Sequence, residues 1–176
     1  MFRLILSFVF IAWCNQALAA SNSIRVEFEA TFYKKTCDID VSEAVINYNK
    51  VSPSDIINSD AGLTDKLNRD ITLKLVNCTN VGNLSKSKIY VSGRTETING
   101  KRLFIESGTS QGVGVKLLAN NIAKTDGDII FDLNAGTTVN DTFTVTTALS
   151  CGDCKKTEEI KKGTLRAALL FTVLTH

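Results

Sequence analysis

A strict alternation of apolar and polar residues over positions 24–32 constrains this chain more than any other feature of its sequence. The apolar members are Ile24, Val26, Phe28, Ala30 and Phe32. A period of two places all five of these side chains on one face of a β-strand. Such a strand needs partners for its backbone N–H and C=O groups as well as for its apolar face. We therefore expect residues 24–32 to join a β-sheet, either in this chain or in another molecule.

Short alternating segments also follow one another through the rest of the chain. The predicted strands are residues 39–41, 45–51, 71–75, 89–91, 103–105, 113–118, 129–133, 143–149 and 164–174. Polar stretches separate them, including residues 52–68, expected to be a loop, and the turn signal at 126–128. No segment shows a helical period of useful length. This pattern predicts one all-β domain, a sandwich of immunoglobulin-like type.

The first 19 residues have the features of a secretory signal peptide. Arg3 supplies a positive charge, residues 4–13 are almost unbroken apolar sequence, and Ala17-Leu18-Ala19 fits an A-x-A cleavage site. The apolar run is shorter than the ~20 residues that span a bilayer. We expect cleavage after Ala19 and export of residues 20–176.

Cysteine usage agrees with export. Cleavage would remove Cys14 and leave Cys37, Cys78, Cys151 and Cys154, which allow three pairings. Cys37 and Cys78 lie in or beside predicted strands, and Cys151-Gly152-Asp153-Cys154 can close a local loop. We therefore predict the bridges Cys37–Cys78 and Cys151–Cys154. Zinc is disfavoured because there is no second C-x-x-C and the only histidine is His176.

The last predicted strand presents two apolar faces. Leu165, Ala167, Leu169, Phe171 and Val173 lie on one face. The other face, with Ala168, Leu170 and Leu174, is also largely apolar, so we expect both faces to be covered. No further strand follows it in this sequence, so its outer edge is expected to lack a partner from its own chain.

Composition disfavours several other classes of function. A single histidine gives little support to Ser-His or Cys-His nucleophile pairs, so we predict that the protein is not an enzyme and has no cofactor, metal or small-molecule substrate. After loss of Arg3, 19 basic residues face 18 acidic ones. The charges are interspersed, and the small cluster at Lys155, Lys156, Lys161 and Lys162 is interpreted as a solvated loop. Nucleic-acid binding is therefore not expected.

Four motifs, in order, resemble the subunits of chaperone–usher pili of the type 1 and P kind. The sequence Phe28-Glu29-Ala30-Thr31-Phe32 precedes Cys37 as the family's apolar-x-G-x-apolar extension precedes its first cysteine. The family's L-x-N-C motif is matched at residues 75–78, and its G-apolar-G-apolar-x-L motif at residues 112–117. The last strand runs from Gly163 through Phe171-Thr172-Val173 to the end. The sequence departs from the pattern at Ala30, where Gly is usual, at Thr175, where Tyr is usual, and in its additional C-x-x-C.

The resemblance implies an incomplete immunoglobulin-like sandwich that lacks its final strand. It implies a donor extension at residues 20–36 and a pilin domain at 37–176. A groove beside Leu165, Ala167, Leu169, Phe171 and Val173 would accept first a strand of a periplasmic chaperone and then, at an outer-membrane usher, the N-terminal strand of a neighbouring subunit. The protein would pass through the periplasm to a fimbrium on the cell surface and serve in adhesion.

The sequence allows one alternative interpretation and disfavours another. In a self-contained secreted binding module, residues 24–32 would pair within their own chain. A two-domain tip adhesin would carry an additional lectin domain, for which this chain has no room.

Overall fold

The computed structural model describes residues 34–35, 37–78 and 81–175. The signal peptide and the predicted donor residues Ile24, Val26, Phe28, Ala30 and Phe32 lie outside the described residues. Helices and strands have the following bounds: β1 Lys34–Lys35, β2 Asp38–Val41, α1 Pro53–Asp60, β3 Arg69–Val76, the 3₁₀ turn η1 Val81–Lys86, β4 Ser87–Ser92, β5 Thr95–Ile98, β6 Lys101–Phe104, β7 Ser107–Gly108, β8 Gly114–Ala119, β9 Ile122–Lys124, β10 Ile129–Asp132, β11 Thr142–Ser150, η2 Thr157–Glu159, β12 Leu165–Arg166 and β13 Leu170–Thr175.

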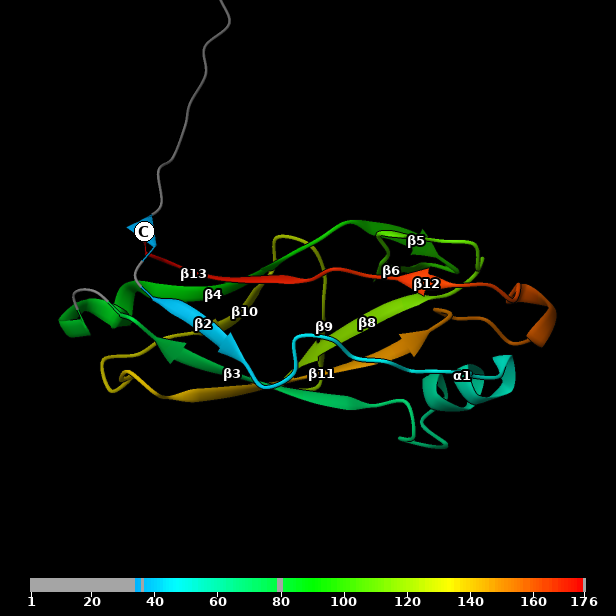
Figure 1. Cartoon of the computed structure of the whole chain (residues 1–176), viewed down its shortest axis with the longest axis horizontal. Coiled ribbons are helices and arrows are strands. Elements are labelled where there is room, and N and C mark those ends of the chain that lie inside the picture. Colours follow the sequence, from blue (N-terminus) through cyan, green and yellow to red (C-terminus); the bar gives the residue numbers. More distant parts are fainter. Residues whose placement is uncertain (1–33, 36, 79–80, 176) are drawn as a thin grey trace, which may run out of the picture. The chain divides into compact units, whose positions relative to one another are not determined.

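The strands form two main antiparallel layers. One sheet has the order β1-β13-β4-β10 and the other the order β2-β3-β11-β8-β6-β5, with β9 paired to β8. A short third pairing joins β12 to β7. Figure 1 shows β13 and β4 along one side, β3 and β11 along the other, and α1 near one end of the layers. This arrangement confirms the predicted all-β fold class.

Alternating side chains from both layers form the core. Leu73, Leu75, Ile89, Val91 and Leu117 are each completely buried, although they come from three different strands. Because successive side chains of a strand point to opposite faces, only every second residue of β3 and β4 enters this core. The period of two that predicted these strands therefore also determines which of their faces meet.

Both disulfides have the pairing expected from the sequence. Cys37–Cys78 joins the residue before β2 to the chain just after β3, two strands that are already neighbours in the sheet. Cys151–Cys154 closes the turn that follows β11. Cys37, Cys151 and Cys154 are buried.

The prediction that residues 52–68 form a loop is wrong for its first part, where the chain forms helix α1. Ser52 caps the helix, because its side-chain oxygen accepts the backbone N–H of Asp55 at 3.2 Å, and Pro53 follows in the first turn. A serine followed by proline and then an acidic residue is a helix-start signal. The helix has only eight residues, too few to show a clear helical period. No helix in the described part of the chain is long and apolar enough to cross a membrane.

Two predicted strands differ in the structure. Residues 45–51 belong to no strand, because no neighbouring strand of the described chain lies beside them. The predicted strand at 164–174 is divided into β12 and β13, which pair with different partners, β7 and β4. At the break, the carbonyl oxygen of Ala168 lies so close to Gly93 that a Cβ there would be only 2.4 Å from it.

Candidate strand-binding groove

A long apolar groove runs beside the C-terminal segment. Of the five predicted acceptor residues, Leu165, Ala167, Leu169 and Phe171 line it and are partly buried. Val173, the fifth, is completely buried in the core. The structure therefore brings four of the predicted residues to one open surface and buries the fifth in the core.

The opposite wall of the groove is the irregular segment between β2 and α1. Ile46 and Tyr48 are partly buried there, whereas Val45 is 70% exposed. The floor is provided by the other sheet, through Ile71 of β3 and Leu149 of β11. In Figure 1 this segment passes from β2 towards α1 between the two layers. The groove is thus an opening between the sheets, bounded by one irregular segment and one terminal segment.

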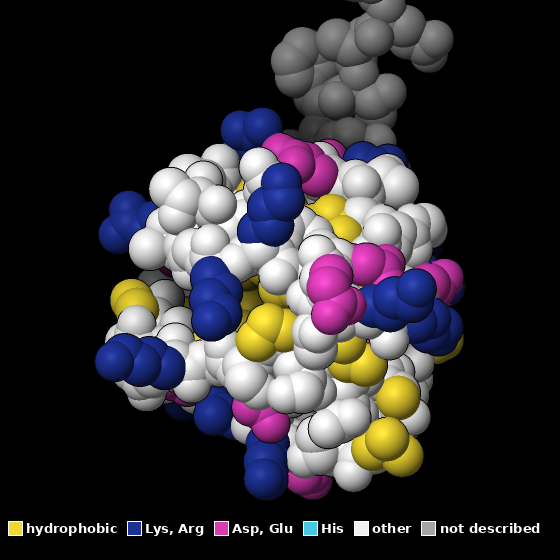
Figure 2. Space-filling view, turned by 90° about the vertical axis from the view of Figure 1, so that its right-hand side faces the viewer, with side chains coloured by type: hydrophobic (Ala, Val, Ile, Leu, Met, Phe, Trp, Pro, Cys, Tyr) yellow, Lys and Arg dark blue, Asp and Glu magenta, His cyan; other side chains and the backbone are white. Residues whose placement is uncertain are grey.

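The groove consists of two adjoining cavities of about 590 Å³ and about 550 Å³. Both are lined by Ile46, Asn47, Tyr48, Leu149 and Leu165, so they form one continuous channel. The first cavity extends to Phe171, and the second ends against Pro53 and Ile56 of α1 and Ile160 after η2. Figure 2 views the molecule from the end that carries α1 and shows hydrophobic side chains among Lys, Arg and acidic ones.

Backbone groups on both walls lack ladder partners among the described residues. On its outer edge, β13 pairs with β1 only at Leu174 and Thr175, whereas its other edge pairs with β4 from Leu170 to Thr175. Residues 43–51 on the facing wall belong to no strand. An inserted strand could therefore form backbone hydrogen bonds with the groove and bury apolar side chains on its floor.

Tyr48 links the irregular wall to the floor. Its hydroxyl is 3.2 Å from the Thr147 hydroxyl on β11, and the Arg69 guanidinium lies 5.6 Å from the centre of its ring. Burial raises the pKa of Tyr48, although the hydrogen bond to Thr147 and the charge of Arg69 partly oppose this rise. Tyr48 is therefore a neutral hydroxyl at neutral pH.

Charged side chains lie on the rim of the groove. Glu43, Glu106 and Arg166 border the first cavity, and Lys50, Lys161 and Lys162 border the second. All six are exposed. The end nearest α1 is therefore basic, whereas the other part has mixed charge.

Sequence reasoning identified one wall of the groove and missed the other. The alternation of Ile46 and Tyr48 predicted a strand over residues 45–51. It did not indicate that this segment would lack a neighbouring strand. Ile56 and Ile160, which close the far end, come from a helix and from a loop after a 3₁₀ turn. No periodic pattern in the sequence indicates that these two residues meet.

Comparison with known proteins gave matches only at the level of structure. No protein-family model matches the sequence, and no curated protein matches it. The fold is similar to the crystal structure of the P pilus rod subunit PapA, with a TM-score of 0.54 and 17% identity over 86% of this chain and 100% of that chain.

A second match is to a chaperone–usher pilus whose structure was solved to explain rod uncoiling. Its TM-score is 0.51 and its identity 15%, over 89% of this chain and 97% of that chain. Both matched structures are pilus proteins rather than enzymes. The chain therefore has the immunoglobulin-like fold of chaperone–usher pilus subunits.

Proposed function

We propose that this protein is a structural subunit of a chaperone–usher pilus that polymerises by strand donation. The observation that carries the proposal is the open apolar groove, whose two walls both lack ladder partners among the described residues. The shared fold with pilus subunits supports the same conclusion. In this proposal the groove accepts residues 24–32 of a neighbouring subunit.

The predicted donor strand matches the groove in chemistry. Four large apolar side chains, at Ile24, Val26, Phe28 and Phe32, would leave water on insertion. At ~1.5–3 kcal/mol each, their burial contributes on the order of 10 kcal/mol before the costs of ordering and association. A head-to-tail contact that repeats without closing produces a filament.

The register of β1 favours donation to another molecule. Lys35 pairs with Leu174 and Lys34 with Thr175 in antiparallel orientation. In an antiparallel pair, residue numbers run in opposite directions along the two strands. In this register, residues before Lys34 would therefore extend past Thr175 and not back towards Phe171. For residues 24–32 to fill the groove beside Leu169 and Phe171, the chain would have to reverse direction after leaving β1. Insertion into a second subunit requires no such reversal.

The proposal also includes the partners and the location implied by the resemblance. A periplasmic chaperone would fill the groove before assembly, and an outer-membrane usher would be the site of exchange. The signal peptide at residues 1–19 would direct export, and the assembled subunit would belong to a fimbrium at the cell surface with a role in adhesion. No enzymatic step is part of this function.

One observation favours the alternative, a self-contained secreted module of the immunoglobulin-like type. The chain's own residues 34–35 already pair with the outer edge of β13. If residues 24–32 also bound within their own chain, the protein expressed without a chaperone would be a soluble, protease-resistant monomer. The pilus proposal instead predicts aggregation alone and a one-to-one complex with a pilus chaperone.

Strand exchange in vitro tests the proposal directly. A peptide of residues 20–35 is mixed with the chaperone-bound subunit from which residues 20–31 have been deleted, and release of the chaperone is measured. We expect displacement by the unmodified peptide and its loss with Phe28→Asp, since an unpaired carboxylate would be buried in the groove. Glu27→Lys, which changes the opposite face of the same strand, is the matched control and should still displace the chaperone. Equal displacement by the Phe28→Asp peptide would contradict the donor assignment.

A further inference from the structure

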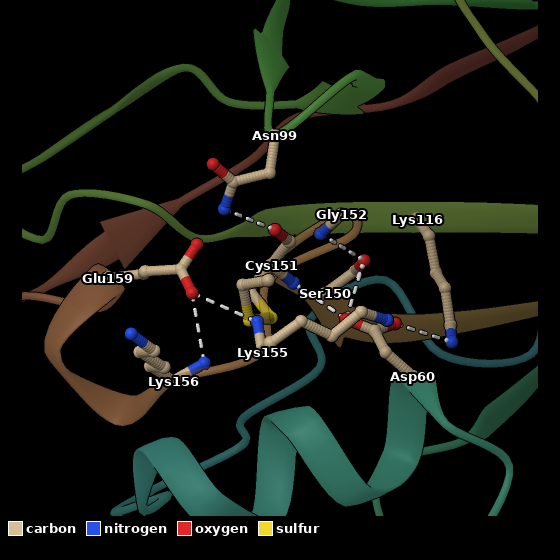
Figure 3. Close-up of a disulfide and its surroundings, with 10 residues drawn as sticks. Asp60, Asn99, Lys116, Ser150, Cys151, Gly152, Lys155, Lys156 and Glu159 are labelled. Carbon is tan, nitrogen blue, oxygen red and sulfur yellow. Dashed lines mark hydrogen bonds and ion pairs between the residues drawn. A yellow bond between two sulfur atoms is a disulfide. The ribbon is translucent and has the colours of Figure 1, made fainter.

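The carboxylate of Asp60 lies at the centre of a polar network that holds the end of helix α1. One oxygen accepts a hydrogen bond from Lys116 Nζ at 3.0 Å. The other accepts from the Ser150 hydroxyl at 3.0 Å and from the backbone N–H of Cys151 at 2.8 Å. The Asp60 side chain is only 13% exposed and that of Lys116 only 20%. Figure 3 shows Asp60 pointing from the end of α1 towards these partners on the neighbouring strands.

The turn closed by Cys151–Cys154 is fixed from a second side as well. Asn99 donates its side-chain amide to the Cys151 carbonyl at 2.9 Å, and the Asn99 carbonyl accepts the N–H of Asp153 at 3.1 Å. Gly152 has a φ of +71°, and a Cβ there would be 2.2 Å from the Ile98 carbonyl oxygen. The turn therefore packs against the β5–β6 hairpin, and Asp60 attaches α1 to this turn (Figure 3).

The same helix forms the end wall of the groove. Pro53 and Ile56 of α1 line the cavity at this end, together with Val113 and Ile160. Ile56 is 4% exposed, and Ile160 follows the 3₁₀ turn that comes after Cys154. Asp60 and the disulfide turn thus fix both elements that close the groove, although neither Asp60 nor the cysteines line it.

We propose that Asp60 is a positioning residue that holds α1 as the end wall of the groove and thereby determines how tightly the groove binds the terminal apolar residue of an inserted strand. This rests on the proposed function. A charge-paired, largely buried carboxylate with three donors is a strong anchor, because removing one partner leaves the others unsatisfied. Loss of the anchor would let the end wall move while the opposite part of the groove, beside Leu169 and Phe171, stays as it is.

A double-mutant cycle between the subunit and the donor peptide tests the proposal. The subunit carries Asp60→Asn, and the peptide of residues 20–35 carries Ile24→Ala, Phe28→Ala or Phe32→Ala. We expect Asp60→Asn to weaken exchange with the unmodified peptide on the order of tenfold, a size common for coupled contacts. The effect of Asp60→Asn should disappear with Ile24→Ala or with Phe32→Ala, whichever of the two residues lies at the end of the strand that contacts α1. It should persist with Phe28→Ala, in the middle of the strand.

The matched control is Asp153→Asn. Asp153 lies in the same turn but is 61% exposed and pairs only loosely with Lys101 at 3.5 Å, so exchange should be unchanged. Ser150→Ala removes one donor to Asp60 and serves as a second, milder variant if Asp60→Asn does not form a chaperone complex. Equal coupling at all three peptide positions, or none at any, would overturn the positioning role. Failure of the unmodified peptide with the unaltered subunit would instead count against the proposed function.

Discussion

Strand β11 and the segment 165–175 have similar alternating sequences but very different surroundings. β11 pairs with β3 from Thr142 to Thr147 and with β8 from Val145 to Ser150. Its inward side chain Val145 is 1% exposed. The C-terminal segment pairs along one side only, apart from the last two residues of β13, and its apolar residues from 165 to 171 remain partly exposed. An alternating pattern thus specifies an apolar face, but the chain topology decides whether a partner covers it.

The largest expected effect concerns the two disulfides, one beside the paired sheet and one near the end of the groove. Cys37–Cys78 spans 41 residues beside the fully paired sheet, and its loss should cost about 4 kcal/mol in the chain-entropy description. Cys151–Cys154 spans three residues near the end of the groove, and its loss should cost about 2 kcal/mol. Urea unfolding of the peptide-filled subunit, with each pair changed to alanine, measures both. A larger loss for the second pair would show that the end wall, rather than the paired sheet, dominates stability.

Two leucine substitutions compare a position in the paired sheet with a position in the groove. Leu117→Ala, at a completely buried position of β8, should cost about 3 kcal/mol whether or not the groove is filled. Leu169→Ala should cost less than about 1 kcal/mol in the unfilled subunit, because its side chain is already partly exposed, and more when a donor peptide covers it.

The measurement is urea unfolding of each variant with and without the unmodified peptide of residues 20–35. If the unfilled subunit aggregates, its resistance to proteolysis after release from the chaperone is measured instead of its unfolding in urea. If Leu169→Ala has the same effect in both states, the groove is not the surface that the peptide covers.

Much of the fold could be predicted because it depends on local alternation. Leu73 and Leu75, Ile89 and Val91, and Val145 and Leu149 all lie in predicted strands and all are buried. The fold class and one wall of the groove follow from the same pattern. The two disulfides follow from the positions of four cysteines in an exported chain.

The remaining features depend on contacts between residues that are distant in the sequence. Asp60 meets Ser150 and Lys116 only because the fold places α1 beside β8 and β11, and no spacing in the sequence indicates this. The irregular wall at residues 43–51 has the alternation of a strand, yet it lacks the neighbour that would make it one. The alternation alone does not decide whether that neighbour comes from this chain or from another molecule.

The last predicted effect concerns the beginning of the end-wall helix. Ser52→Ala should lower the free energy of unfolding by about 1 kcal/mol, since the backbone N–H of Asp55 loses its acceptor at the helix N-cap. Ser54→Ala is the matched control in the same turn, because Ser54 contacts Ser52 but does not cap the helix. An equal loss from Ser54→Ala would contradict the capping role.

Ser52→Ala should also change how the stability of the protein depends on pH. The Ser52 hydroxyl donates a hydrogen bond to the Asp55 carboxylate at 2.6 Å and lowers the pKa of Asp55 below its ordinary value. A carboxylate with a lowered folded-state pKa stabilises the fold above its unfolded pKa, and this contribution is lost as the pH falls through the folded pKa. Ser52→Ala should therefore raise the Asp55 pKa in an NMR titration, and the stability difference from the unaltered protein should narrow in acid. An unchanged Asp55 titration would show that the serine acts on the helix backbone alone.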